Sequence, residues 1–146
     1  MMFKRFSLAV IGLLLTLSVA AKAQGGATVE AMLIRASNGS APLDYRLDRV
    51  VPQLRKIFQF QSYELISQSS VGLTAPGQTS IALGKGHSVD IVARREGGKM
   101  KADVRWIQGG KTLLSTGVTL VTNRPIILGG VQDGSGGTLI VALTAK

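Results

Sequence analysis

His87 is the residue on which hydrolytic or metal-based chemistry in this chain would depend, because it is the single histidine. Zinc and related metals need clustered imidazole, thiol or carboxylate ligands, and the sequence has neither a second histidine nor a cysteine. Asp90 comes three positions later, and residues three apart on a strand point to opposite faces. We therefore predict no metal site and no paired His–Asp catalyst. The adjoining Gly84-Lys85-Gly86 places His87 at the edge of a turn.

Two glycine-rich segments contain residue types that phosphate or cation sites use. Gly110-Lys111-Thr112 matches the end of a phosphate-binding loop, but Arg105 stands where the first glycine belongs, and a strand follows where a helix is required. The segment from Asp133 to Gly137 offers one carboxylate, whereas calcium takes about six to eight ligands. Both segments are predicted to be hairpin turns. Because no carboxylate pair or Ser-x-x-Lys spacing stands out either, we predict no catalytic, cofactor-binding or metal-binding residue and no enzymatic activity.

The densest cluster of charge forms a candidate basic interaction face. It lies in two adjacent predicted hairpins, and its members are Arg94, Arg95, Lys99, Lys101, Arg105 and Lys111. Glu96 and Asp103 lie among them, which leaves a local balance of +4. Single-stranded nucleic acid is bound by aromatic side chains placed between cations, and no such pattern occurs here, so no nucleic-acid partner is expected. The alternative is that these residues only protect strand edges from unwanted pairing.

One segment has the spacing of an amphipathic helix. Its apolar residues recur every three or four positions, at Leu43, Leu47, Val50, Val51, Leu54, Ile57 and Phe58. Pro52 lies inside this pattern, where a proline removes a hydrogen-bond donor and clashes with the preceding turn. We therefore expect a helix over residues 43–58 that kinks at Pro52, or a short first turn followed by a helix that begins near Pro52.

The remaining sequence predicts strands separated by glycine-rich turns. The expected strands cover residues 27–36, 62–67, 70–75, 79–83, 87–95, 99–107, 112–121, 125–131 and 138–144. Alternation places Trp106 with Val104 on a buried face. Residues 126–128 and 139–143 are apolar on both faces, which is typical of central strands. We predict a mainly β fold, an antiparallel β-sandwich or meander with one helix in its N-terminal half.

The N-terminal segment has the features of a signal peptide. Lys4 and Arg5 precede an apolar stretch from Leu8 to Ala20, and Ala21-Lys22-Ala23 is a cleavage signature of the small-x-small type. This stretch is shorter than the roughly 20 apolar residues that span a bilayer. We predict that residues 1–23 are removed after Ala23; the alternative is an uncleaved anchor.

The expected mature chain, residues 24–146, is a single β-rich domain without disulfides. Loss of the three cations of the signal peptide lowers the formal charge from +9 to +6. A charge of this size lies within the range that keeps small domains soluble, and it also favours anionic partners. We expect no transmembrane segment in the mature chain.

Several segments together resemble small exported β-rich proteins of Gram-negative bacteria that have no assigned activity. The segments are residues 29–38, residues 54–60, Ser62-Tyr63-Glu64-Leu65, Ile127-Leu128-Gly129-Gly130 and residues 139–144. The resemblance covers most of the mature chain. The strand that ends in Gly129-Gly130 is also similar to a piece of secretin-type outer-membrane proteins. Neither likeness transfers a functional residue.

These observations favour a non-enzymatic periplasmic or extracellular domain that binds or scaffolds another component of the cell envelope. Its partner would be an envelope protein, bound by strand addition at a sheet edge or through the basic interaction face. The first alternative is a charge-driven binder of an anionic lipid or polymer. The weakest alternative is a hydrolase that uses His87. We expect no cofactor.

Overall fold

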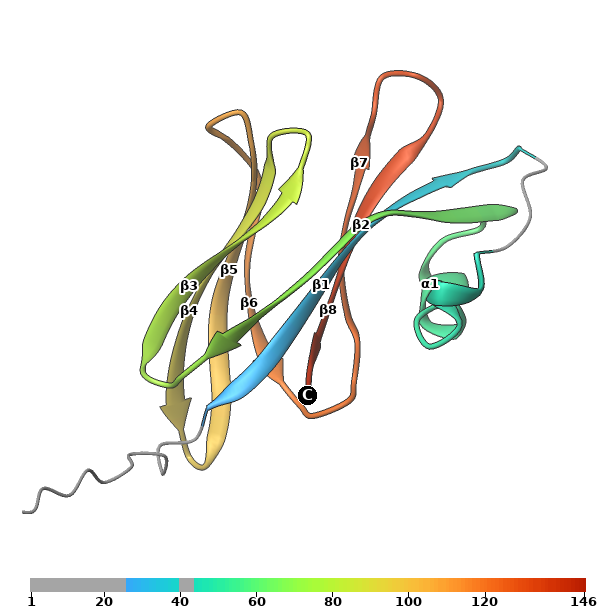
Figure 1. Cartoon of the computed structure of the whole chain (residues 1–146). Helices are drawn as coiled ribbons and strands as arrows, with labels where there is room; N and C mark the ends of the chain where they lie inside the picture. The colour runs from blue at the N-terminus through green and yellow to red at the C-terminus, as the bar shows by residue number, and fades with distance from the viewer. Residues whose placement is uncertain (1–25, 40–43) are drawn as a thin grey trace, which may run out of the picture.

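The computed structural model describes residues 26–39 and 44–146, so the predicted signal peptide lies outside the described residues. Eight strands and two short helical elements make up this part of the chain (Figure 1). In chain order they are β1 (Ala27–Ser37), the 3₁₀ helix η2 (Tyr45–Leu47), α1 (Val51–Ile57), β2 (Ser62–Leu73), β3 (Gly77–Gly84), β4 (His87–Glu96), β5 (Lys99–Gln108), β6 (Lys111–Leu120), β7 (Ile126–Gln132) and β8 (Thr138–Ala145).

The strands form two four-stranded sheets in which the pairing between neighbours is antiparallel throughout. One sheet has the order β2-β1-β8-β7 and is called the helix-covered sheet below. The other has the order β3-β4-β5-β6, a simple meander, and is called the solvent-facing sheet. Figure 1 shows the two sheets as separate layers, with α1 beside the helix-covered one. The expected class, a mainly β fold with an antiparallel sandwich and one α-helix, is confirmed.

The main core lies between the two sheets and follows the alternation of the strands. On β5, Ala102, Val104 and Trp106 are fully buried, whereas Asp103 and Arg105 between them are exposed. Trp106 is therefore a core residue, as its place in the pattern predicted. A period of two with one apolar side is what a sheet requires when one face meets another layer and the other meets water.

A second core lies on the opposite side of the helix-covered sheet. Residues 44–58, which connect β1 to β2, pack over the outer face of β1 and β8. They are called the helical segment below. Leu47, Val50 and Leu54 of this segment are buried against Ile34 and Ile140 of the sheet. As a result, β8 and the middle of β1 are buried on both faces, and the residues there are mostly apolar without clear alternation.

The helical segment differs from one continuous helix. A 3₁₀ turn, η2, comes first, and the only α-helix among the described residues, α1, begins at Val51, so Pro52 lies in its first turn. Proline is tolerated there because the first backbone donors of a helix have no partner within the helix. The second of the two predicted arrangements is therefore confirmed, and the expectation of a helix over all of residues 43–58 is wrong.

The predicted strands 62–67 and 70–75 are one strand, β2, which was wrongly divided at its polar centre. Ser67, Gln68 and Ser69 are residue types typical of a turn, yet they pair with β1. The register of the two strands shifts once, at a bulge between Leu33 and Ile34, and pairing continues on both sides of it. Polar side chains are tolerated here because β2 is an edge strand whose outer side faces solvent.

Apolar residues on both faces correctly predicted a central position for β8 but not for β7. β7 is an edge strand and pairs only with β8 among the described strands. Its apolar side chains pack against the main core on one face and the second core on the other. A bulge interrupts it at Gly129, whose φ is +112°. A Cβ at this position would lie 2.8 Å from Trp106 Cζ3. Only glycine combines this backbone conformation with such a close approach.

Within the described ranges, no helix is long and apolar enough to cross a membrane.

Candidate functional site

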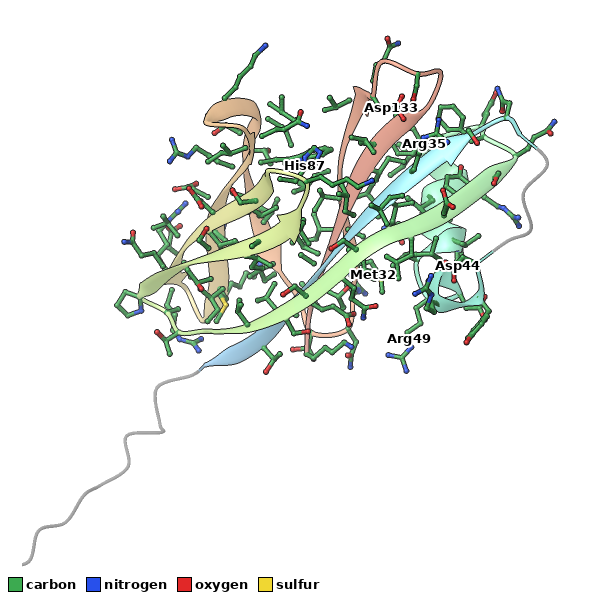
Figure 2. All side chains as sticks on the ribbon, turned by 45° about the horizontal axis from the view of Figure 1, so that its top comes forward. Met32, Arg35, Asp44, Arg49, His87 and Asp133 are labelled. Carbon is green, nitrogen blue, oxygen red and sulfur yellow. The ribbon has the colours of Figure 1, made fainter. Side chains whose placement is uncertain are left out.

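His87 is a buried partner of Trp106 rather than an exposed turn residue. It is the first residue of β4, directly after the predicted turn, but its side chain points between the sheets and is only 5% exposed (Figure 2). Trp106 Nε1 donates a hydrogen bond to His87 Nδ1 over 3.1 Å. Burial lowers the pKa of His87, and nearby Lys85 lowers it further. Since Nδ1 accepts a hydrogen bond from the indole N–H and therefore carries no proton, this arrangement favours the neutral imidazole.

The carboxylate nearest to His87 in sequence is on the other face of the sheet. Asp90 accepts a hydrogen bond from Ser80 Oγ over 2.7 Å and lies 3.6 Å from Arg105 Nη2. No carboxylate of the described residues is hydrogen-bonded to His87, and these residues contain no group of three or more potential metal ligands. The geometry expected for a His–Asp pair is therefore not formed.

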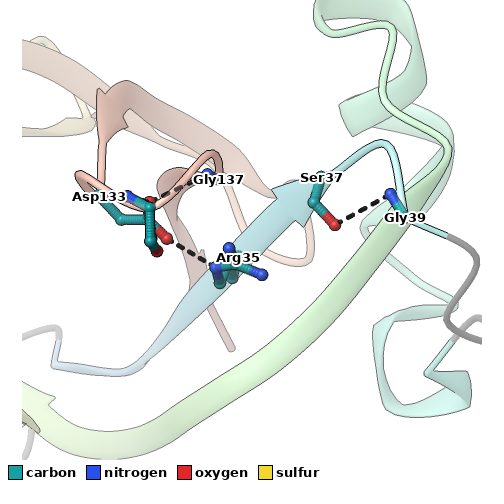
Figure 3. A network of polar contacts seen from close by, with 6 residues as sticks. Arg35, Ser37, Gly39, Asp133 and Gly137 are labelled. Atoms are coloured by element: carbon teal, nitrogen blue, oxygen red, sulfur yellow. Dashed lines mark hydrogen bonds and ion pairs between the residues drawn. The ribbon is translucent and has the colours of Figure 1, made fainter.

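Asp133 fixes the β7–β8 loop instead of offering open ligand positions (Figure 3). Its Oδ2 accepts from Arg35 Nε over 2.6 Å, and its Oδ1 accepts from the backbone amides of Ser135 and Gly137. These hydrogen bonds, above all the one from Arg35, hold the pKa of Asp133 well below its usual range. A Cβ at Gly137 would lie 2.5 Å from Arg35 Nε, so a larger residue there would displace the guanidinium from its place beside Asp133.

The basic interaction face is brought together only in part. Its four members on the outer side of the solvent-facing sheet are Arg94, Lys99, Lys101 and Arg105. Arg95 pairs with Met100 in the ladder and lines a separate hollow with it. Lys111 lies at the opposite end of the sheet, where it pairs with Gln108.

Acidic side chains neutralise most of this face. Arg94 Nε lies 2.5 Å from Glu96 Oε2 and Arg94 Nη1 lies 3.0 Å from Asp103 Oδ2, and Arg105 faces Asp90. Four basic and three acidic residues therefore share the outer side of the sheet, for a local charge of +1. Exposed pairs of this kind contribute little to stability, but they weaken attraction for a polyanion.

A different surface combines a concave shape with cations, and sequence reasoning missed it. A hollow of about 630 Å³ opens on the outer face of the helix-covered sheet, beside the first half of the helical segment. Ligand sites commonly have volumes of about 300–1,000 Å³. Its lining residues come from β1, the helical segment, the β6–β7 connection and the end of β8, and they are Glu30, Met32, Arg46, Arg49, Val50, Asn123, Pro125, Thr144 and Lys146.

The floor of the hollow is formed by neighbouring residues of β1 and β8. Glu30 and Met32 are both buried, and Glu30 pairs with Thr144 across the ladder. Glu30 Oε2 accepts from Gln68 Nε2 over 2.5 Å, and its Oε1 lies 3.2 Å from Lys146 Nζ. Both oxygens of this buried carboxylate therefore have a protein partner. The ion pair with Glu30 also holds Lys146 at the rim of the hollow.

The wall on the side of the helical segment is held by Asp44. Its carboxylate accepts from Arg46 Nε over 2.9 Å and Arg46 Nη2 over 2.7 Å, and it caps the backbone amide of Arg46. The hydrogen bonds from Arg46 lower the pKa of Asp44 to about 2. Asp44 also accepts from the amide of Leu65 over 3.4 Å, which ties the helical segment to β2.

Arg49 is the cation of this hollow that no acidic residue neutralises. Arg46 is paired with Asp44 and Lys146 with Glu30, whereas Arg49 makes no ion pair with any described residue. It is exposed, and it lies with Met32 and Asp44 in the region where the helical segment meets the sheet (Figure 2). The hollow therefore places a positive rim beside a mixed lining, in which Met32 of the floor and Val50 of the helical segment are the apolar side chains.

The sequence contains one signal of this hollow. Every second residue of β1 faces outward, and these residues change from polar Thr28 and Glu30 to apolar Met32, Ile34 and Ala36. Such a change predicts that only part of the outer face is covered. It could not reveal that Arg49 and Lys146, which are far apart in sequence, reach the uncovered part.

No protein-family model, no curated protein and no solved structure matches this chain, so the proposals that follow rest on its own residues.

Proposed function

We propose that the protein is a non-enzymatic binding domain of the bacterial cell envelope, exported to the periplasm, and that its ligand is an amphipathic anion. The anionic group binds at Arg49, and the apolar part lies over Met32 and Val50. The observation that carries this proposal is the unneutralised Arg49 at the rim of the hollow of about 630 Å³.

The chemistry of the hollow favours an anion with an apolar portion over a purely polar ion. Arginine binds carboxylates and phosphates through a planar set of donors, and its weak hydration suits a site that is partly dry. An apolar tail would lie against Met32 and Val50, which line the hollow although both are buried members of the second core. Fatty carboxylates and the phosphate headgroups of lipids share this chemistry.

The basic interaction face is a less suitable site for the same ligand. Its arginines already face Asp90, Glu96 and Asp103, so an incoming anion would have to compete with them. It also lies on a sheet surface for which alternation provides polar rather than apolar contacts. Binding at the face remains the alternative that the experiment below separates from binding in the hollow.

Calorimetric titration with decanoate and decyl phosphate tests the proposal. We expect saturable binding of one or both anions and no binding of decyltrimethylammonium or decyl maltoside. The variant Arg49→Gln should weaken binding about tenfold, since a hydrogen bond to a charged group contributes roughly 1.5–3 kcal/mol. A preference between decanoate and decyl phosphate distinguishes a fatty acid from a phosphate headgroup.

Two variants serve as matched controls. Arg55→Gln removes an exposed cation of the same helical segment that does not line the hollow, and it should bind as the parent does. Lys99→Gln combined with Lys101→Gln removes charge from the basic interaction face. Loss of binding in this pair but not in Arg49→Gln would refute the hollow and favour the face.

Export is tested separately by recovering the protein from the periplasmic fraction and measuring its intact mass. The expected mass is that of residues 24–146, with Gln24 as the new N-terminus. A full-length mass in the membrane fraction would support an uncleaved anchor instead.

A further inference from the structure

The edge strand β6 lacks the usual protection against pairing with another chain. It pairs only with β5 among the described residues, and from Thr112 to Leu120 it contains neither a charged residue nor a proline. The register between β5 and β6 shifts once, between Trp106 and Ile107 of β5, which is near the beginning of β6. Residues 114–120 therefore form a regular edge. Natural proteins usually block such edges with lysine, proline or a bulge.

Two of the other three edge strands carry their own protection, and the third, β3, which contains neither a charge nor a proline, has β2 beside it. β2 carries Glu64 and a bulge opposite Leu33, and it lies against β3, the edge strand that follows it in the chain. β7 is interrupted by its bulge at Gly129. The contrast with β7 is informative because β6 and β7 lie on the same side of the sandwich. Only β6 offers an uninterrupted ladder of backbone groups there.

The sequence of β6 is nearly the same when read outward in either direction from Gly117. From the centre, the matched positions are Thr116 and Val118, Ser115 and Thr119, and Leu114 and Leu120. Each pair is identical or close in shape: two β-branched residues, two hydroxyl residues and two leucines. In an antiparallel pair of identical strands centred on Gly117, these positions face one another.

We propose that the protein forms a homodimer in which β6 pairs antiparallel with β6 of a second copy, with the twofold axis at Gly117. The two solvent-facing sheets then become one continuous eight-stranded sheet. The proposal does not depend on the ligand of the hollow, which belongs to the other sheet.

The faces of β6 agree with this pairing. The residues of β6 that point toward the core are Leu114, Thr116, Val118 and Leu120, and the first three are only partly buried in one copy. A second β6 would extend the core across the axis by placing leucine beside leucine. On the outer side, Ser115 would face Thr119 of the second copy, which is a favourable pair in antiparallel sheets.

Sedimentation equilibrium of the protein, expressed from its full sequence and purified in the form that the cells yield, tests the oligomeric state. We expect the mass of a dimer that dissociates on dilution. A monomer at all concentrations up to several hundred micromolar would overturn the proposal.

Charge variants then test whether β6 forms the interface. Ser115→Lys with Thr119→Lys places like charges opposite one another twice and should raise the dimer dissociation constant about tenfold or more. Ser115→Glu with Thr119→Lys places opposite charges there and should restore the dimer. Both positions are exposed in one copy, but they lie opposite Arg105 and Lys101 of β5, so a circular dichroism spectrum of each variant must first match that of the parent. A double-lysine variant as dimeric as the parent would contradict the proposal.

A matched control adds the same charge to another edge. Gln78→Lys with Ala82→Lys places two lysines on the exposed side of β3 and should leave the dimer intact. If this variant also dissociates, net charge rather than strand pairing controls association, and the proposal fails.

Single cysteines test the register, because the chain has no cysteine of its own. Gly117→Cys faces its own copy across the axis, at a Cα separation of about 4.5–5.5 Å that permits a disulfide. A Cβ at Gly117 meets nothing closer than Asp103 Oδ1, at 3.4 Å. Mild oxidation should therefore crosslink this variant.

Thr119→Cys is the control for the register. It lies on the same side of β6 but about 14 Å from its own copy in the proposed pairing, too far for a disulfide. Crosslinking at position 117 without crosslinking at 119 supports the axis at Gly117. Equal crosslinking at both positions, or at 119 alone, would refute it.

Discussion

The two sheets have the same number of strands and the same antiparallel pairing, yet their outer faces are built differently. The helix-covered sheet has a second core on its outer face, formed with Leu47 and Leu54 of the helical segment. The solvent-facing sheet exposes its outer face, where Arg94 and Arg105 are paired with acids. The difference follows from chain connectivity, because only the link between β1 and β2 is long enough to fold back over a sheet.

This comparison shows where the alternation of residue types is informative. On β5, which has water on one side, alternation identified the buried face correctly. On β1 and β8, which are covered on both sides, the apolar runs correctly indicated double burial for β8. A similar run on β7 belongs to an edge strand, so double coverage and a central position are separate properties.

The largest expected effect is at the core between the sheets. Trp106→Ala should lower the free energy of unfolding by about 3–5 kcal/mol, because it removes a fully buried ring and leaves His87 without its hydrogen-bond donor. Chemical denaturation measures this change. Val92→Ala, on the outer face of the same sheet and 47% exposed, should change it by less than about 0.5 kcal/mol. Equal losses would remove the distinction between the two faces.

The second prediction concerns the cover of the other sheet. Leu54→Ala should cost about 2–5 kcal/mol, since Leu54 is fully buried between α1 and the sheet. Ile57→Ala in the same helix is the control, because Ile57 is 56% exposed. A loss for Leu54→Ala close to that of the control would mean that the helical segment rests on the sheet without forming a core.

A smaller, pH-dependent effect is expected in the core between the sheets. Because the pKa of His87 is lowered in the folded protein, the unfolded chain binds the proton more tightly, and stability should fall as pH decreases below about 6.5. His87→Asn keeps an acceptor for Trp106 and should remove this dependence between pH 7 and 5. Denaturation followed by the fluorescence of the single tryptophan measures it. An unchanged slope in the variant would contradict the assignment.

The smallest expected effect is in the helical segment and appears only in acid. The pKa of Asp44 is about 2 in the folded protein against an ordinary 3.8, so its contribution is present above pH 3.8 and is lost as pH falls toward 2. Asp44→Asn should therefore flatten the decline of stability in this range. Asp48→Asn, at an exposed position of the same segment, should retain it. Denaturation at pH 4, 3 and 2 compares the variants.

The candidate hollow was outside the reach of sequence reasoning for a specific reason. Glu30 and Lys146 stand at opposite ends of the described chain and meet only because β1 and β8 are neighbours. The same is true of Arg35 and Asp133, which are 98 residues apart. By contrast, the basic interaction face was visible in sequence because β4 and β5 form a hairpin. The acidic residues that neutralise this face lie in the same hairpin, but which of them faces which arginine depends on the register of β4 and β5.

The amino-acid sequence by itself determined the fold class, most turns and the place of Trp106 in the core, because these depend on residue type and local period. The tertiary structure decided which strands are neighbours, the continuity of β2, the edge position of β7, the His87–Trp106 pair and the cationic hollow. The physical reason is that side chains far apart in sequence meet only after non-consecutive strands pair. Local periodicity determines which face of a strand is buried, but it carries no information about the neighbouring strand.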